Sequence, residues 1–247
     1  MHGGAGIIDS ENPATALGDI KPTDIIKLRR IALNCQMSCN IGEDQALYRR
    51  TGKDFNLKNN EEMAGKAAQA ALGVASCGVD IIKVGLDNMQ PKVVKVVLSE
   101  IVNSLNSVFP KAQTCTVFFA NEEKDYKGKV DPFTEGVEIT KECGADAIMV
   151  DTRETTKKKN IGLAPYLGPE KRGNIYTMEE IQQFVNFCHK NNIECMLAGS
   201  VQISQAATLW STGCDVIAVR GAIGGRNYPK EKVRRELVAQ MIPSQGV

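Results

Sequence analysis

Charged side chains recur late in four similar segments of the chain, and their types suit carbonyl chemistry. The segments are GGAGIID at 3–9, CGVDIIKVG at 77–85, CGADAIMVD at 143–151 and TGCDVIAVR at 212–220. The charged residues in or just after them are Asp9, Glu11, Lys83, Asp151 and Arg220. Carboxylates can move protons, and a lysine can polarise a carbonyl group or form an imine with it. We therefore predict that these residues form a catalytic site.

Strand geometry explains why these side chains would meet. Residues two apart in a β-strand point to the same face. When the four segments are aligned on their turns, the charged residues share one parity and branched apolar residues such as Ile82 and Val150 take the other. We expect the apolar set to pack against helices and the charged set to line the C-terminal mouth of a barrel. A structural ion-pair layer, for example Lys83 with Asp151, is the alternative. Because desolvating each charge costs several kcal/mol, a functional site is favoured.

Two glycine-containing segments suit a phosphate group. LAGSVQ at 197–202 ends a strand and opens a helix, whose first N–H groups are unpaired and attract anions. VRGAIGG at 219–225 adds a cation and glycines whose backbone can approach a ligand closely. The predicted phosphate-binding residues are Gly199, Ser200, Arg220 and Gly221. Plain tight turns at these positions are the alternative.

A long segment, 152–176, follows the strand that contains Asp151. Loops of this length are uncommon in compact domains and often act as lids. The basic run 157–159 within it is interpreted as a solvated surface in preference to a ligand clamp.

Strand-like and helix-like stretches alternate along the chain and would position these residues. The repeated segments stand roughly 70 residues apart, the length of two strand–helix units. Further apolar strands are predicted at 31–39, 113–120 and 194–200, and helices at 22–32, 60–76, 91–108, 131–143, 177–191 and 202–213. Thr177 and Glu180 form a predicted capping box. The pattern favours a single α/β domain over 1–247, a (βα)8 TIM-type barrel, with a doubly wound sheet as the alternative.

The count of predicted strands is seven, whereas a complete barrel has eight. The sequence opens within a repeat at GGAGIID, so we expect the first βα unit to be lacking or truncated. Unpaired strand edges beside such a gap favour aggregation. A partner segment or a further N-terminal stretch would remove that risk.

Composition excludes several classes of protein. The net charge is +1, which predicts no general attraction to nucleic acid or anionic membranes. Eight scattered cysteines in 247 residues indicate reduced thiols and a cytoplasmic protein. No segment has the length and apolar character of a signal peptide or a membrane span. His2 and His189 are too few for a metal cluster, and His189 is expected at the C-terminal end of a helix.

The same segments carry a family resemblance that covers nearly the whole chain. GGAGIIDSENPATALG is similar to the GGADIIDVKNPxxGSLG motif of (5-formylfuran-3-yl)methyl phosphate synthases. CGVDIIKVGL resembles their GADYIKVGL, and CGADAIMVDT their GCDVAMLDT. The resemblance implies a (βα)8 barrel lyase that joins two molecules of glyceraldehyde 3-phosphate for methanofuran biosynthesis. It also implies a lysine imine as the reactive group and no metal or organic cofactor.

Mapped onto this chain, the resemblance gives Asp9, Lys83 and Asp151 as catalytic positions. The lysine that forms the imine in the family falls on Glu11, and a further lysine falls on Thr155. A carboxylate cannot form an imine, and carboxylates near Lys83 would keep that amine charged. We therefore expect a diverged paralogue that binds a similar ligand with altered chemistry.

Two functions remain open at this point. The first is a lyase-like enzyme of one-carbon metabolism, in the methanofuran or tetrahydromethanopterin branch, which acts on a triose phosphate type of compound. In it, Asp9, Glu11 and Asp151 would move protons and Lys83 would polarise the carbonyl group or form the imine. The second is a silent paralogue that senses a phosphorylated metabolite or partners an active homologue. We expect a homo-oligomer, or a hetero-oligomer with such a homologue.

Overall fold

The computed structural model describes residues 4–10, 20–42, 57–86, 89–120, 124–152, 161–165, 173–224 and 232–242. Backbone contacts divide the chain into two compact units. The N-terminal unit comprises Ile7–Phe118 and Tyr126–Ile148. The C-terminal unit comprises Met1–Gly6, Phe119–Asp125 and Met149–Val247.

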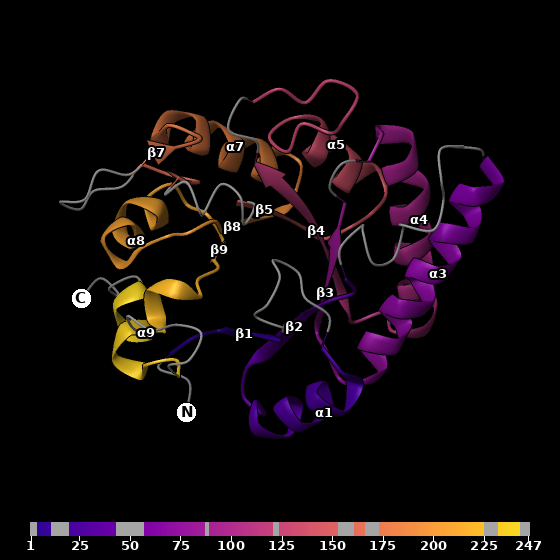
Figure 1. The fold of residues 1–247 in the computed structure, drawn as a ribbon, viewed down its shortest axis with the longest axis horizontal. Helices are drawn as coiled ribbons and strands as arrows, with labels where there is room; N and C mark the ends of the chain where they lie inside the picture. Colours follow the sequence, from indigo (N-terminus) through magenta and orange to yellow (C-terminus); the bar gives the residue numbers. More distant parts are fainter. Residues whose placement is uncertain are drawn as a thin grey trace. The chain divides into compact units, whose positions relative to one another are not determined.

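Strands and helices alternate in the N-terminal unit (Figure 1). Its strands are β1 (Ile7–Ser10), β2 (Gln36–Asn40), β3 (Ile81–Gly85) and most of β4 (Gln113–Ala120). Its helices are α1 (Pro22–Ile31), α3 (Leu57–Ser76), α4 (Pro91–Val108) and α5 (Glu135–Glu142). The strands pair in parallel from β1 to β4, which is the pattern that crossover helices produce.

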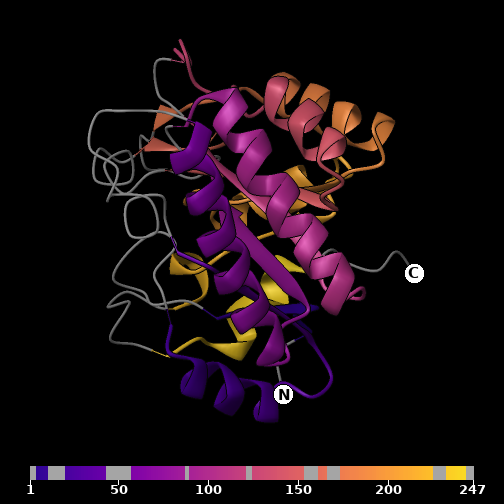
Figure 2. The ribbon, with the colours of Figure 1, turned by 90° about the vertical axis from the view of Figure 1, so that its right-hand side faces the viewer.

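Helices α3 and α4 pack side by side (Figure 2). Helix α4 begins at Pro91, whose fixed φ suits the first turn, and buries apolar residues at three- and four-residue spacing. Helix α3 contributes a stripe of buried alanines, which lets the two backbones approach closely. The stripe consists of Ala64, Ala67, Ala68, Ala71 and Ala75.

The C-terminal unit continues the alternation. Its strands are β5 (Ala147–Thr152, which starts in the N-terminal unit), β8 (Glu194–Leu197) and β9 (Val216–Ile217). Its helices are α7 (Met178–Lys190), α8 (Ile203–Trp210) and α9 (Arg235–Met241), with a 3-10 turn η1 (Gly221–Ile223). Helix α7 starts with the predicted capping box of Thr177 and Glu180. None of the described helices combines the length and apolar character needed to cross a bilayer.

One sheet contains seven strands in the order β1-β2-β3-β4-β5-β8-β9. The order follows the sequence without reversal, as in a βα barrel, whereas a doubly wound sheet reverses its order at a switch point. The barrel-type prediction and its seven strands are therefore confirmed, and the doubly wound alternative is wrong. The expectation of a lacking first βα unit stays a prediction.

The repeated turns share one backbone conformation. The glycine at the second position of each repeat has a positive φ: Gly4 +91°, Gly78 +88°, Gly144 +75° and Gly213 +82°. Only glycine adopts this region without strain, so the glycines are a requirement of the turn.

An aspartate two residues later in three of the repeats binds the start of the preceding strand. The backbone N–H of Met37 donates to Asp80 at 2.8 Å, and that of Thr114 donates to Asp146 at 2.7 Å. The N–H of Cys195 donates to Asp215 at 2.8 Å. These aspartates satisfy backbone donors at the N-terminal ends of strands, so they stabilise the fold.

Three predictions about elements need correction. The described parts of 152–176 are not a simple loop, because β6 (Ile161–Gly162) and β7 (Gly173–Asn174) form a short parallel ladder. Leu163 between them is fully buried and donates its N–H to Gly199. The strand predicted to reach Arg220 ends at Ile217, and helix α9 is missing from the prediction. The basic run 157–159 lies outside the described residues.

Candidate functional site

Asp9 and Lys83 form an ion pair in the N-terminal unit. The Nζ atom of Lys83 on β3 lies 2.5 Å from Oδ2 of Asp9 on β1, although β2 separates the two strands. Both residues lie on the same face of the sheet, because Asp9 is in register with Ser38, and Asn40, two residues further, is in register with Lys83. The structure therefore brings these two predicted side chains together, and their catalytic role stays a prediction.

The two partners differ in their access to solvent. The Lys83 side chain is 3% exposed, whereas the Asp9 side chain is 38% exposed. A buried ammonium group needs a paired counter-charge, because an unpaired one costs several kcal/mol. Asp9 supplies that charge and still presents part of its carboxylate to solvent. Of the two, Asp9 is the group that a bound molecule meets first.

Two buried polar residues on β2 complete this polar face. The hydroxyl of Ser38 donates to Oδ1 of Asp9 at 2.6 Å. Oδ1 of Asn40 accepts the N–H of Gly42 at 2.9 Å, which shapes the turn after the strand. Sequence reasoning missed both residues. The signal was available in IALNCQMSCN, where two polar residues of equal parity interrupt an apolar strand.

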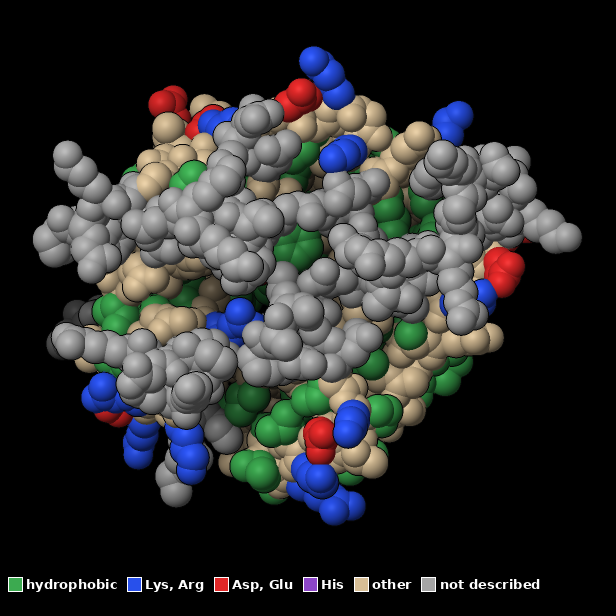
Figure 3. All heavy atoms as spheres, in the orientation of Figure 1, with side chains coloured by type: hydrophobic (Ala, Val, Ile, Leu, Met, Phe, Trp, Pro, Cys, Tyr) green, Lys and Arg blue, Asp and Glu red, His purple; other side chains and the backbone are tan. Residues whose placement is uncertain are grey.

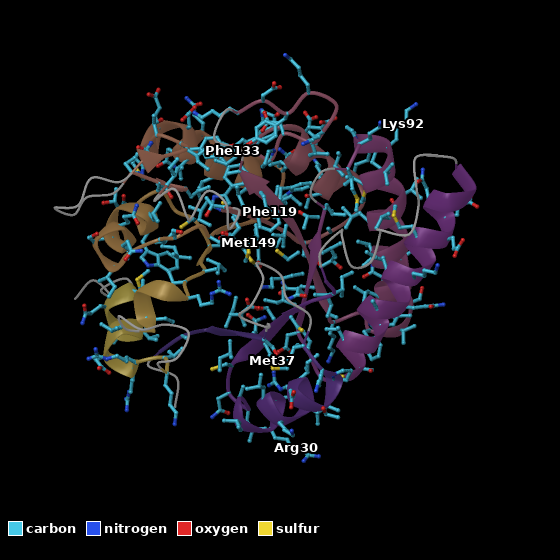
Figure 4. The ribbon with its side chains drawn as sticks, in the orientation of Figure 1. Arg30, Met37, Lys92, Phe119, Phe133 and Met149 are labelled. Carbon is cyan, nitrogen blue, oxygen red and sulfur yellow. The ribbon has the colours of Figure 1, made fainter. Side chains whose placement is uncertain are left out.

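The opposite face of these strands is apolar and faces helices. Figure 4 shows Met37 on the side of β2 that carries α1, and its side chain is fully buried. Burial, with the nearby Asp9 carboxylate, raises the pKa of the Cys39 thiol to about 12. Cys39 therefore stays a neutral, structural thiol. On the same face of β4, Thr116 shares a hydrogen bond of 2.8 Å with Thr140 of α5.

The remaining predicted acid in the described chain, Asp151, lies at the end of β5 in the C-terminal unit. Its Oδ1 accepts the N–H of Thr152 at 2.6 Å, and its side chain is half-buried. Glu11 and Thr155 lie outside the described residues, so the structure does not place them.

The predicted phosphate residues Gly199 and Ser200 form a tight turn between β8 and α8. Both have positive φ, +104° and +59°. A Cβ atom at Gly199 would lie 2.8 Å from Cγ2 of Thr152 and 3.1 Å from Cβ of Leu163, so no larger residue fits. The Thr152 hydroxyl beside it is buried and has no hydrogen-bond partner among the described residues. The turn is therefore closely packed against Thr152 and Leu163.

Arg220 and Gly221 follow β9, at the start of η1. A Cβ atom at Gly221 would meet nothing within 4 Å, so packing does not require glycine there. The open space leaves the backbone accessible to a ligand. Like Gly199 and Ser200, both residues belong to the C-terminal unit.

Of the two histidines in the sequence, His189 lies among the described residues. His189 lies in the last turn of α7, where its Nε2 is 2.9 Å from Asp215. This is the predicted position at the C-terminal end of the helix. The described residues contain no group of three or more histidine, cysteine or acidic side chains able to hold a metal ion.

On the side shown in Figure 3, described Lys, Arg, Asp and Glu side chains appear in small separate groups. A ligand with negative charge would therefore depend on local groups such as Arg220.

Solved structures of low sequence identity share the fold. A crystal structure of 3-hexulose-6-phosphate synthase matches with a TM-score of 0.56 and 11% identity over 96% of this chain and 85% of that chain. The Amycolatopsis orientalis BexX/CysO complex matches with a TM-score of 0.51 and 13% identity over 97% and 77%. These likenesses support the TIM-type barrel class.

Sequence comparison identifies closer relatives. A (5-formylfuran-3-yl)methyl phosphate synthase of Methanosarcina acetivorans is 28% identical over 245 residues, 97% of this chain and 90% of that protein. One from Methanobrevibacter smithii is 31% identical over 236 residues, 93% and 86% of the two chains. The family model described as 4-HFC-P synthase matches residues 1–242. The chain belongs to the 4-HFC-P synthase family.

Proposed function

We propose that this protein is an enzyme that performs a lyase-type reaction on a small phosphorylated carbonyl compound of the triose phosphate type. The observation that carries the proposal is the Asp9–Lys83 ion pair, in which the lysine side chain is buried and the aspartate side chain is partly exposed to solvent. It stands at two positions that the sequence shares with (5-formylfuran-3-yl)methyl phosphate synthases. The reaction would belong to methanofuran biosynthesis or a neighbouring branch of one-carbon metabolism.

In the proposed step, Asp9 takes a proton from the carbon next to the carbonyl group. The electron pair of that C–H bond then moves toward the carbonyl oxygen, which becomes negatively charged. Once Asp9 is protonated and neutral, its attraction for Lys83 falls. The Lys83 ammonium group is then available to stabilise the oxygen.

An imine on Lys83 is less favourable than this electrostatic role. Imine formation requires a neutral amine, and a carboxylate 2.5 Å away favours the ammonium form. The side chain is also almost fully buried, so a substrate carbon could reach Nζ only after the ion pair opens. We expect no Lys83 adduct when the protein is treated with borohydride and glyceraldehyde 3-phosphate and analysed by mass spectrometry.

The proposed phosphate ligands are Gly199, Ser200, Arg220 and Gly221, with Asp151 and Glu11 as further groups for proton transfer. The positive φ of the 199–200 turn and the open backbone at Gly221 support an anion site. The guanidinium group of Arg220 would supply the charge that backbone donors lack.

The function is tested by incubating the purified protein with triose phosphates and identifying the products. We expect turnover that falls at least about a hundredfold in Asp9→Asn, the loss typical of removing a general base. Asp24→Asn is the matched control, because Asp24 pairs with Lys27 on the surface of α1. Equal activity of wild type and Asp9→Asn would contradict the assignment.

A second candidate is a silent paralogue that binds a phosphorylated metabolite or completes an oligomer with an active homologue. Glu11 at the position of the family's imine-forming lysine favours it. Co-purification from the source organism tests it, and robust turnover by the purified protein alone would remove the need for it. A cytoplasmic location belongs to either proposal and is supported by eight cysteines that form no disulfide among the described residues.

A further inference from the structure

Each oxygen of the Asp9 carboxylate is bound by a donor from a different strand. Lys83 on β3 engages Oδ2 at 2.5 Å, and the Ser38 hydroxyl on β2 engages Oδ1 at 2.6 Å. Ser38 is only 6% exposed, so water competes weakly for its hydrogen bond. A carboxylate held at both oxygens cannot rotate about its Cβ–Cγ bond without losing one of them.

We propose that Ser38 is a positioning residue that fixes Asp9 against Lys83 and thereby keeps Lys83 an ammonium group. Its hydroxyl has one proton, which it donates to Oδ1 of Asp9. Without that donor, the half-exposed carboxylate turns toward water and its pairing with Lys83 weakens. The catalytic meaning of this arrangement rests on the function proposed above.

The strand register makes Ser38 specific for this role. Ser38 is the direct neighbour of Asp9 in the parallel ladder, whereas Met37 and Cys39 point to the opposite face. Asn40 shares the face, but its Oδ1 accepts the N–H of Gly42. The Ser38 side chain lies beside Asp9 in this register and hydrogen-bonds to its carboxylate.

The test measures how fast the Lys83 amine reacts, since only a neutral amine is acylated. Wild type, Ser38→Ala and Ser38→Thr are treated with acetic anhydride at pH 8, and peptide mass spectrometry gives the Lys83 rate relative to Lys27. Lys27 is a suitable reference because its side chain is 71% exposed. We expect Ser38→Ala to raise the Lys83 rate about tenfold, the effect of losing one charge-assisted hydrogen bond. Ser38→Thr keeps the hydroxyl and should restore the wild-type rate.

Thr116→Val is the matched control. It also removes a buried hydroxyl from a strand of the same unit, but on the opposite face of the sheet. The proposal is overturned if Ser38→Ala leaves the Lys83 rate unchanged, or if Thr116→Val raises it equally through general loosening. Turnover with triose phosphates is measured separately on the same proteins. If the Lys83 acetylation rates change as expected but the wild-type protein shows no turnover, the positioning role of Ser38 stands and the proposed function is contradicted.

Discussion

Burial and charge pairing act in opposite directions on the amine of Lys83. Loss of water disfavours the ammonium form, and the Asp9 carboxylate favours it. A buried charge without its partner is more costly than an apolar side chain in the same place. Lys83 and Asp9 should therefore respond differently to substitution.

We expect Asp9→Ala to lower the free energy of unfolding by about 1–3 kcal/mol, because it leaves Lys83 buried and unpaired. Lys83→Met should cost less, or even stabilise the protein, since methionine fills similar space and Asp9 can be solvated. Urea unfolding of the three proteins gives the comparison. If Lys83→Met lowers the free energy of unfolding more than Asp9→Ala does, the unpaired lysine charge is not the main cause of destabilisation.

Cys39 should make stability depend on alkaline pH. Burial, with the Asp9 carboxylate, raises its pKa from 9.0 to about 12, so the folded protein holds the thiol proton more tightly than the unfolded chain. The stabilising contribution is complete below about pH 9 and is lost as pH rises through 12. We expect the free energy of unfolding to fall over that range, and to fall less in Cys39→Ala. Identical slopes in both proteins would assign the change to other groups.

Position 11 tests whether the chain is a diverged synthase. Glu11→Lys combined with Thr155→Lys restores lysines at the two positions where the family has them. We expect borohydride and glyceraldehyde 3-phosphate to trap an adduct on the lysine introduced at position 11, together with a low furan-forming activity. A folded double mutant that forms neither product would show that the pocket has been rebuilt for another reaction.

Among the elements, the repeated turn combines a glycine that bends the chain with an aspartate that binds a strand. Asp146 illustrates this, because its carboxylate accepts the N–H of Thr114 at 2.7 Å while its own N–H donates to the carbonyl oxygen of Thr114. We expect Asp146→Ala to destabilise the protein by about 1–2 kcal/mol. Asp24→Ala, which removes a surface ion pair, should change stability by less than about 0.5 kcal/mol. Thermal unfolding distinguishes the two, and equal effects would contradict a special role of the repeat.

Continuous apolar strands and capped helices were the predictable elements. Buried strands such as β3 and β4 are fixed by their composition, and α7 by its capping box. β9 is shorter than predicted because its backbone leaves the ladder before the apolar run ends. The β6–β7 ladder consists of two residues per strand, too few for a periodic signal.

The repeated segments predicted part of the candidate site, and a further signal, two polar residues of equal parity in IALNCQMSCN, lay outside them. Aligning the four turns gave Asp9 and Lys83 the same parity, and the structure pairs them. Ser38 and Asn40 lie on an intervening strand outside that alignment, so tertiary neighbours and not sequence spacing bring them to the site. The register that joins β1, β2 and β3 is a property of the sheet, which no local pattern encodes.

At the scale of the whole molecule, binding of a ligand and the chemical step are two properties that can be separated. The family match over residues 1–242 and the 28–31% identity to (5-formylfuran-3-yl)methyl phosphate synthases are the basis for proposing a phosphorylated ligand. In the proposed function, Glu11 at the position of the family's imine-forming lysine would change the chemical step and would leave the proposed phosphate ligands in place. Ligand binding should therefore persist whether or not the protein catalyses a reaction.

Thermal unfolding of the full chain with and without ligand tests this separation. A ligand that binds only the folded state stabilises it by about 2.7 kcal/mol at a hundred times its dissociation constant. We expect glyceraldehyde 3-phosphate to raise the melting temperature, and glyceraldehyde at the same concentration to raise it much less, because it lacks the phosphate group. Arg220→Met should remove most of the difference between the two compounds, whereas Asp9→Asn should retain it. Equal shifts by both compounds in wild type would mean that the protein does not recognise phosphate, and would contradict both proposed functions at once.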